Sequence, residues 1–455
     1  MDGFVEASIR QTWAEKSTDT VLMYVKSSTK FFSWPFIVLR ARRYRLRPHH
    51  PRHFRRGGGI SRSRWCLARP SWPSGRTRIR IPGKRRSKAL SSSVMDSVTQ
   101  AVLGAVVGVA VAGRRIGPRK AAIAGAVLGT MPDLDVFFPH DDPVSSYVLH
   151  RGPTHSLIIQ GLATPLFAEP LVRFLEKFRD RRWTAYLMVY LVFATHALLD
   201  AMTVYGTKLL WPLTNHPFGV GSMFIIDPLY TLPLLVVAVW ALFRSALSDR
   251  LHRWTKGALT ISTLYLAWSA VGQAVVTDRA ATILTVQGVK VERLIATPTP
   301  FNTLLWRVIA VNKDQYFNLY TSLFAGDEAI PVHAHDRGTR PPFCMETIEA
   351  AGKVATFAKG FVRFKRVGDV LMVGDLRMGF PPGFVFDFAV AHWDGVGFVA
   401  IKPERIGSSR TAEGDMDWLV AGILGNAIPR PAEIANLLTA DPTQRVDAGA
   451  GKPSC

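Results

Sequence analysis

Six apolar segments follow one another along the middle of the chain, at roughly residues 96–112, 120–138, 154–172, 183–203, 222–243 and 257–276. A transmembrane helix needs about 20 mostly apolar residues, and the last three segments meet this requirement most clearly. Gly, Pro or polar residues interrupt the first three. The pattern predicts an α-helical integral membrane bundle of about six transmembrane helices over residues 95–276.

The hydropathy pattern changes after about residue 277. Short runs rich in β-formers, such as ATILTVQGVKVERLIATPTP and GFVRFKRVGDVLMVGDLRMGF, are broken by Gly, Pro and Asp, which is typical of strands and hairpins. We therefore expect a β-rich (α+β) domain over residues 277–440. Helices are predicted within it at 344–358 and 415–425, and a disordered tail at 441–455.

Composition supports a membrane protein, because 48% of the residues are hydrophobic and only 20% are charged. The net charge of +22 is concentrated near the start of the chain. Residues 1–94 hold 22 Lys or Arg and 4 Asp or Glu, which accounts for +18 of that charge. Nothing in the rest of the chain favours nucleic-acid binding. The three cysteines, Cys66, Cys344 and Cys455, lack the spacing of a thiolate metal site.

From Arg40 to Lys88 there is no acidic residue, and Arg, Pro, Ser and Gly dominate. Such a stretch cannot bury enough apolar surface to fold by itself, so we expect the basic extension at residues 1–94 to be disordered. It could be an arm for nucleic acid or anionic lipid, a targeting peptide, or an upstream extension that is not translated. We favour the last interpretation, because Met95 opens the membrane part with MDSVTQAVLGAVVG.

Charge in the connecting loops predicts the orientation of the bundle. The loops at 114–120, 173–182 and 244–256 are basic, whereas those around 139–153 and 204–221 are poor in Lys and Arg. Basic loops stay in the cytoplasm, so the other two loops should face outward. With six spans, the C-terminal domain would also be extracytoplasmic.

Polar residues capable of chemistry fall on the outward halves of these predicted spans. MPDLD supplies Asp133 and Asp135, and HRGPTHS supplies His150 and His155. An acidic residue near hydrocarbon is costly unless it is paired or bound to metal, although an acidic helix end could also mark the membrane surface. A single His could simply be a packed or capping residue.

A second set of polar residues lies deeper. HALLD places His196 and Asp200 four residues apart, on one helix face. They could bind metal or form a hydrogen bond that ties helices together. Asn215, His216 and Asp227 are weaker candidates, and Asp227 is better explained as a helix N-cap. Imidazole nitrogens with carboxylate oxygens suit Zn²⁺, Mn²⁺ or Fe²⁺ better than Ca²⁺ or Mg²⁺.

In combination and order, the motifs resemble those of the YdjM-like family of bacterial inner-membrane proteins. The similarity runs from MDSVTQAVLGAVVG through GTMPDLD, HRGPTHSL, HALLDAMTVYGTKLLWP, FIIDPLYTLP and TPTPFNTLLWR to DLRMG at 375–379, and leaves out residues 1–94. The resemblance implies a membrane-bound metal-dependent hydrolase whose polar site comprises Asp133, Asp135, His150, His155, His196 and Asp200. Gln100 departs from the family pattern, which often has His in this position and so one more imidazole.

Two hypotheses follow. In the first, the six residues hold a divalent ion, with Zn²⁺ favoured, and metal-activated water attacks an ester-type or phosphoester-type bond of an amphiphilic or envelope substrate. His155 and Asp200 would be catalytic. In the second, the same residues form a structural metal or polar cluster, and the C-terminal domain binds partners. The lipid bilayer is the expected partner in both, and the sequence predicts no oligomeric state.

Overall fold

The computed structural model describes residues 90–224, 226–324, 330–338, 347–407, 412–426 and 428–438. The chain divides into two units, Met1–Arg78 and Ile79–Cys455, and all described residues belong to the second. Most of the predicted basic extension and the predicted tail at 441–455 therefore lie outside the described residues. Residues 90–94 are helical, so the first helix begins upstream of Met95.

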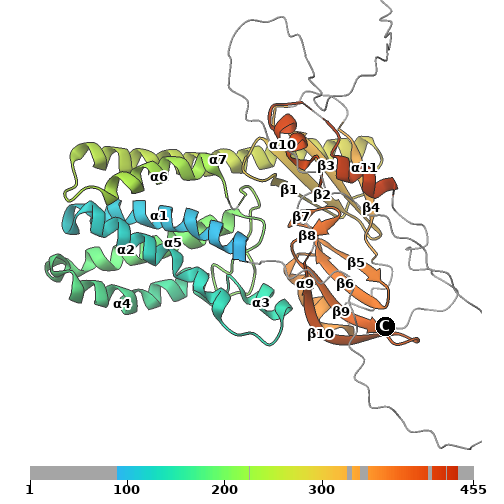
Figure 1. The fold of residues 1–455 in the computed structure, drawn as a ribbon, viewed down its shortest axis with the longest axis horizontal. Helices are drawn as coiled ribbons and strands as arrows, with labels where there is room; N and C mark the ends of the chain where they lie inside the picture. Colours follow the sequence, from blue (N-terminus) through green and yellow to red (C-terminus); the bar gives the residue numbers. More distant parts are fainter. Residues whose placement is uncertain are drawn as a thin grey trace, which may run out of the picture. The chain divides into compact units, whose positions relative to one another are not determined.

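The first part of the described chain is helical (Figure 1). Its α-helices are α1 (Leu90–Ile116), α2 (Pro118–Thr130), α3 (Pro143–Leu149), α4 (Leu157–Phe174), α5 (Arg182–Met202), α6 (Pro228–Leu242) and α7 (Asp249–Val286). Three short 3-10 helices connect them, namely η1 (Pro132–Phe137), η2 (Pro153–His155) and η3 (Glu176–Arg181).

Four helical segments in the described part of the chain are long and apolar enough to cross a membrane. They are Val98–Ile116, Leu157–Phe174, Glu176–Met202 and Asp249–Val286, and α6 adds a shorter apolar helix of 15 residues. The predicted segment at 120–138 is not one helix, because α2 ends at Thr130 and η1 begins with Pro132. A multi-span bundle is therefore supported, while the number six stays a prediction.

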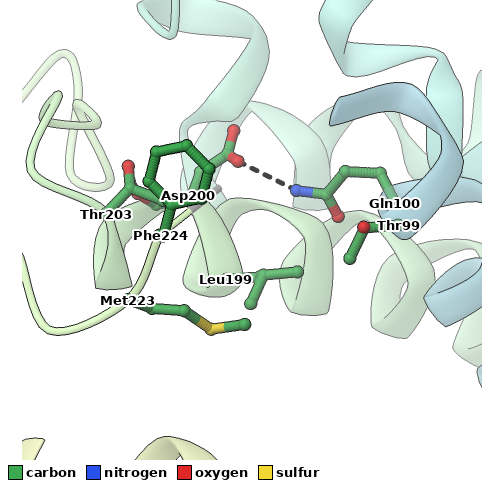
Figure 2. A pocket seen from close by; sticks show the side chains of 7 residues that line it. All are labelled: Thr99, Gln100, Leu199, Asp200, Thr203, Met223 and Phe224. Carbon is green, nitrogen blue, oxygen red and sulfur yellow. Dashed lines mark hydrogen bonds between the residues drawn. The ribbon is translucent and has the colours of Figure 1, made fainter. Parts of the chain in front are cut away.

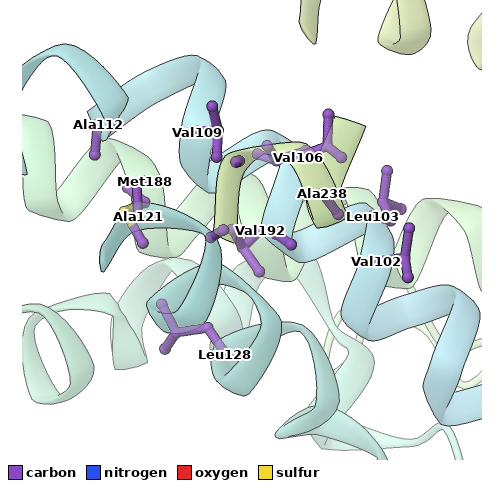
Figure 3. Close-up of a cluster of buried hydrophobic side chains, with 14 of the residues drawn as sticks. Val102, Leu103, Val106, Val109, Ala112, Ala121, Leu128, Met188, Val192 and Ala238 are labelled. Carbon is purple, nitrogen blue, oxygen red and sulfur yellow. The ribbon is translucent and has the colours of Figure 1, made fainter. Parts of the chain in front are cut away.

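The bundle core is formed mainly by small and branched side chains from α1, α2, α5 and α6 (Figure 3). Helices α1 and α2 approach very closely where Gly104 and Gly108 of α1 face Gly125 and Gly129 of α2. A Cβ on either Gly104 or Gly125 would collide with the backbone carbonyl of the other, and one on Gly129 would lie 2.6 Å from the carbonyl oxygen of Gln100. This agrees with the close helix approach that the glycine spacing predicts.

The second part of the described chain is built on antiparallel sheets (Figure 1). One sheet has the order β1-β2-β3-β4, with strands Arg293–Pro298, Leu305–Val311, Gln315–Ser322 and Val332–Asp336. Another has the order β10-β9-β6-β5, with strands Phe398–Ile406, Asp387–Trp393, Val370–Asp375 and Val362–Val367. A small hairpin pairs β7 (Gly379–Phe380) with β8 (Gly383–Phe384). The predicted β-rich region is confirmed.

Helices also contribute to this region. The predicted helices at 344–358 and 415–425 correspond to α9 (Glu349–Phe357) and α10 (Asp415–Ile423), and α11 (Pro431–Leu438) was not predicted.

One strand prediction is wrong. Residues 281–286 were expected in a β-rich run but continue α7, which has 38 residues. The reason is a helical apolar stripe: Val276, Ala280 and Leu284 lie four residues apart and pack on the first sheet beside Trp306 and Val308. Burial of this stripe overrides the local β propensity of the Ile-Leu-Thr-Val run.

Candidate metal centre

Four polar side chains from three elements converge at one end of the helical bundle. Asp133 comes from η1, His155 ends η2, and His196 and Asp200 lie one turn apart on α5. One ligand atom from each residue lies within 4.8 Å of all the others. We call these four residues the metal group. Their arrangement could hold a metal ion.

The individual distances in the metal group are short and similar. His155 Nε2 lies 3.1 Å from both His196 Nε2 and Asp200 Oδ2, and 3.4 Å from Asp133 Oδ1. His196 Nε2 lies 3.5 Å from the same two carboxylate oxygens. Four ligands at 2.0–2.2 Å from a tetrahedral Zn²⁺ would be separated by roughly 3.3–3.6 Å. The five separations that involve an imidazole nitrogen are therefore close to those around a tetrahedral ion of this size, and all four donor atoms lie within 4.8 Å of one another.

The hydrogen bonds on the far side of each imidazole fix its protonation. His196 Nδ1 lies 2.7 Å from the carbonyl oxygen of Gly129, which can only accept, so Nδ1 carries the proton. His155 Nδ1 lies 2.9 Å from Thr154 Oγ1, and that hydroxyl donates to Asp135 Oδ2 at 2.9 Å. His155 Nδ1 is thus also a donor. In the neutral rings, both Nε2 atoms present lone pairs to the centre of the group.

Two of the six residues predicted as metal ligands, Asp135 and His150, lie beside the metal group and outside it. Asp135 accepts hydrogen bonds from the Arg151 backbone N–H at 3.1 Å and from Thr154 Oγ1, and it pairs with His150 Nδ1 at 2.7 Å. It therefore holds the turn that carries His155. Carboxylates that orient metal-binding imidazoles in this way are a regular part of metal sites.

Both carboxylates of η1, which lies outside the apolar helices, are stabilised in their ionised form. Burial by itself raises the pKa of Asp133, but contacts with the His155 and His196 rings, when these carry a second proton, outweigh it and hold this pKa well below its ordinary value. Burial likewise raises the pKa of Asp135, and the hydrogen bond with His150 brings it below its ordinary value. Ionised carboxylates are the form that binds a cation.

Sequence reasoning missed Arg151. This residue is almost fully buried, and its Nε lies 3.2 Å from Asp200 Oδ2 while its Nη1 donates to Thr203 Oγ1 at 2.9 Å. Its backbone is left-handed, with φ 58°, an uncommon conformation for a residue other than Gly. The only signal was its place between the two histidines of HRGPTHS, in a loop otherwise poor in cationic residues.

Gln100 contacts the metal group indirectly. Its Nε2 donates to Asp200 Oδ1 at 2.9 Å, which leaves Asp200 Oδ2 for the group (Figure 2). Gln100 also lines a small pocket with Thr99, Leu199, Asp200, Thr203, Met223 and Phe224, which has room for about one water molecule. The amide thus fixes the rotation of the carboxylate.

The weaker candidates are not brought into the metal group. Asn215 and His216 are exposed. Asp227 caps α6, accepting from the backbone N–H groups of Leu229 at 2.9 Å and Tyr230 at 3.3 Å, and its second oxygen accepts from the Tyr265 hydroxyl at 2.8 Å. The N-cap interpretation of Asp227 is confirmed.

Comparison with known proteins finds similarity in the helical part of the chain, which contains the metal group. Residues 95–276 match the family model described as YdjM inner membrane protein, and all four members of the metal group lie in that range. The inner membrane protein YbcI of Escherichia coli (strain K12) is 31% identical over 115 residues, a match covering 23% of this chain and 61% of that protein. No solved structure matches this chain significantly. Over residues 95–276 the chain is therefore similar to the YdjM inner membrane protein family.

Proposed function

We propose that this protein is a membrane-bound metal-dependent hydrolase that cleaves an ester-type or phosphoester-type bond of an amphiphilic or envelope substrate. The observation that carries the proposal is the pair of Nε2 atoms facing each other at 3.1 Å, with two carboxylate oxygens beside them. In the neutral rings these two atoms carry lone pairs, which repel each other unless a proton or a metal ion lies between them. The mixed nitrogen and oxygen donors favour Zn²⁺, with Mn²⁺ or Fe²⁺ as alternatives.

The four members of the metal group would hold the ion, and Asp135, Thr154, Gln100 and the Gly129 carbonyl would orient them. A divalent ion in such a site supplies Lewis-acid activation of water and polarises the bond to be cleaved. Arg151 compensates part of the negative charge of the two buried carboxylates through its contact with Asp200.

His155 and Asp200 were predicted as catalytic from the sequence, and in this proposal both act by binding the ion. Asp200 is held by Gln100 and Arg151, which stabilise its anionic form and make it a weak proton acceptor. The Asp133 side chain retains 15% of its exposure, whereas the other three side chains retain at most 4%. Asp133 is therefore the member of the metal group that lies nearest to solvent, at the side from which a water molecule could reach a bound ion.

The surroundings of the site support an amphiphilic substrate. Next to Asp133, the side chains of Leu134, Val136, Phe137 and Phe138 are exposed, at 48%, 44%, 78% and 58%. Apolar side chains of this kind are stable at a membrane–water interface and costly in water. A substrate anchored in the bilayer could therefore present its polar headgroup to the metal group directly.

We also propose that this end of the bundle and the C-terminal domain face the periplasm. The basic residues gather at the opposite end, where Arg114 at the end of α1 lies 3.9 Å from Asp249 at the start of α7. The positive-inside rule makes that end cytoplasmic. Alkaline phosphatase fused to the C-terminus should be active and a fused green fluorescent protein dark. The reverse result would overturn the orientation.

A non-enzymatic role is the second candidate, and the burial of the site favours it. His155, His196 and Asp200 are 0–3% exposed, so a bound ion could simply tie α5 to η1 and η2. The C-terminal domain would then be the part that binds partners in the envelope.

Activity measurements separate the two candidates. The full chain in detergent or liposomes is tested for chelator-sensitive hydrolysis of lipid-linked esters and phosphoesters, beside Asp133→Asn and His216→Ala. The hydrolase proposal predicts activity that chelation and Asp133→Asn abolish and that the exposed control His216→Ala retains. Metal-dependent stability without hydrolysis of any substrate in the panel would favour the structural role.

A further inference from the structure

The motif DLRMG in the C-terminal domain lies far from the metal group in sequence but contacts the segments that carry it. Asp375, at the end of β6, accepts a hydrogen bond from the hydroxyl of Tyr147 on α3 at 2.6 Å. Arg377 donates to the Tyr147 hydroxyl at 3.3 Å and to the Val204 carbonyl at 3.3 Å. Asp375 and Arg377 are themselves paired at 2.8 Å and almost fully buried.

The two segments held by this pair are also joined to each other. The Tyr205 hydroxyl donates to the Tyr147 carbonyl at 2.5 Å, and the Tyr147 ring packs against Phe357, Phe386 and Phe388 of the C-terminal domain. Buried side chains of α3, α9 and the second sheet form one hydrophobic cluster here. The contact is thus a packed, hydrogen-bonded interface.

Each segment is bonded either to a residue that supports the metal group or to the backbone of one of its members. Three residues after Tyr147, His150 pairs with Asp135, and the Arg151 backbone is bonded to the same carboxylate. Before Val204, Thr203 caps the end of α5 and bonds to the Asp200 carbonyl through both its N–H at 3.1 Å and its hydroxyl at 2.7 Å. The Arg151 guanidinium lies over the Tyr205 ring at 5.2 Å and links the two segments.

We propose that the C-terminal domain positions the metal group, through Asp375 and Arg377 acting on Tyr147 and on the turn after α5. The two residues are positioning residues, because they touch none of the four ligand atoms. They fix the separation between the turn that presents His155 and the helix end that presents Asp200. The positioning role rests on the proposed metal site, whereas the contact between the C-terminal domain and α3 can be tested without metal.

The chain offers a close match for a control. Asp415 pairs with buried Arg430 at 2.8 Å through both of its oxygens and accepts the Ala412 N–H, much as Asp375 pairs with Arg377 and accepts its N–H. These partners of Asp415 all belong to the C-terminal domain. Asp375→Asn and Asp415→Asn should therefore destabilise that domain similarly, but only the first loosens the contact with α3.

The test measures hydrogen–deuterium exchange of residues 143–156 in the metal-free full chain, and Zn²⁺ affinity by competition with a chromophoric chelator. We expect Asp375→Asn to speed exchange in that segment and to weaken Zn²⁺ binding about 10–100-fold, as loss of an outer partner typically does. Asp415→Asn should change neither. Tyr147→Phe, which keeps the ring and loses the hydroxyl, should shift both readouts in the same direction to a smaller extent.

Unchanged exchange in both Asp375→Asn and Tyr147→Phe would overturn the inference, whether or not the wild type binds metal. Faster exchange with unaltered Zn²⁺ affinity would overturn the positioning role and leave a purely structural contact. A wild type that binds no Zn²⁺ would refute the proposed function. The exchange comparison would still decide whether the C-terminal domain holds residues 143–156 in place. Equal effects of Asp375→Asn and Asp415→Asn would reduce the result to general destabilisation and contradict the proposal.

Discussion

His155 and His196 face each other with their Nε2 atoms 3.1 Å apart, while the Nδ1 atom of each is already engaged as a donor. Neither nitrogen can therefore donate to the other in the neutral state. The contact is stable only if a proton or a metal ion lies between the rings. Two carboxylate oxygens within 3.1–3.5 Å of these nitrogens supply the negative charge that a divalent ion needs.

Loss of either imidazole from the metal group should abolish tight metal binding. His155→Ala and His196→Ala each remove one of four donors, so their affinity should fall by more than the 10–100-fold typical for outer partners. His150→Ala is the matched control, since that imidazole pairs with Asp135 outside the group. Metal content of the purified chains, measured by inductively coupled plasma mass spectrometry, checks this. A His150→Ala chain as metal-poor as His155→Ala would refute the four-residue assignment.

Substitution of Asp135 should lower the affinity for Zn²⁺ and leave the number of bound ions per chain unchanged. Asp135→Asn weakens the acceptor for Thr154 and for the Arg151 N–H, so the imidazole of His155 loses its fixed orientation. We expect about 10–100-fold weaker Zn²⁺ binding with one ion still bound at saturation. A competition titration gives both values. Complete loss of binding would instead make Asp135 a direct ligand.

The close packing of α1 on α2 should be coupled to the site through Gly129. A methyl group there would lie 2.6 Å from the Gln100 carbonyl oxygen, and the displaced Gly129 carbonyl is the acceptor for His196 Nδ1. Gly129→Ala should cost about 1–3 kcal/mol of stability and also weaken metal binding. Gly257→Ala on α7, with open space around the added methyl, should be neutral or stabilising by up to about 1 kcal/mol. Thermal unfolding of both variants decides this, and equal behaviour would contradict the packing account.

The metal group could be predicted in large part from the sequence, because its residues follow local rules. His196 and Asp200 share a helix face by their spacing, and carboxylates or imidazoles near hydrocarbon need a partner. The sequence could not distinguish the residues whose atoms would bind the ion from the residues that orient them. Asp135 is two residues from Asp133, but the turn of η1 directs it to His150 and Thr154, outside the metal group.

The remaining features depend on contacts between distant segments. The role of Arg151 follows from a left-handed turn that brings it to Asp200, and no local pattern predicts that turn. The length of α7 depends on the sheet that buries its last turns. Likewise, Asp375 and Tyr147 are 228 residues apart, so their hydrogen bond could be seen only in the folded chain.

Acid should destabilise the C-terminal domain through Glu433. Burial raises the pKa of this carboxyl, but its hydrogen bond with His335 at 2.7 Å and the bond from Tyr320 outweigh burial and lower the pKa below its ordinary value. A lowered folded-state pKa gives stability that is present above the unfolded pKa of about 4.3 and is lost as pH falls through the folded value.

The Glu433→Gln variant tests whether Glu433 stabilises the domain near neutral pH and loses this effect in acid. It should lose about 1.5–3 kcal/mol near neutral pH, because a bond to a charged group becomes a neutral one. Its stability should then depend less on pH below about pH 5 than that of the wild type. Thermal unfolding between about pH 3 and 7 gives the comparison. Parallel curves for the two chains would show that Glu433 does not contribute to acid sensitivity.

The most direct measurement of the central claim is X-ray absorption at the metal edge of the purified full chain, combined with its metal content. The account predicts about one divalent ion per chain, with nitrogen and oxygen ligands at about 2.0–2.2 Å and the scattering signature of two imidazoles. It also predicts that His196→Ala removes that signature. A chain that stays free of metal after reconstitution, or an ion without imidazole ligands, would contradict the account.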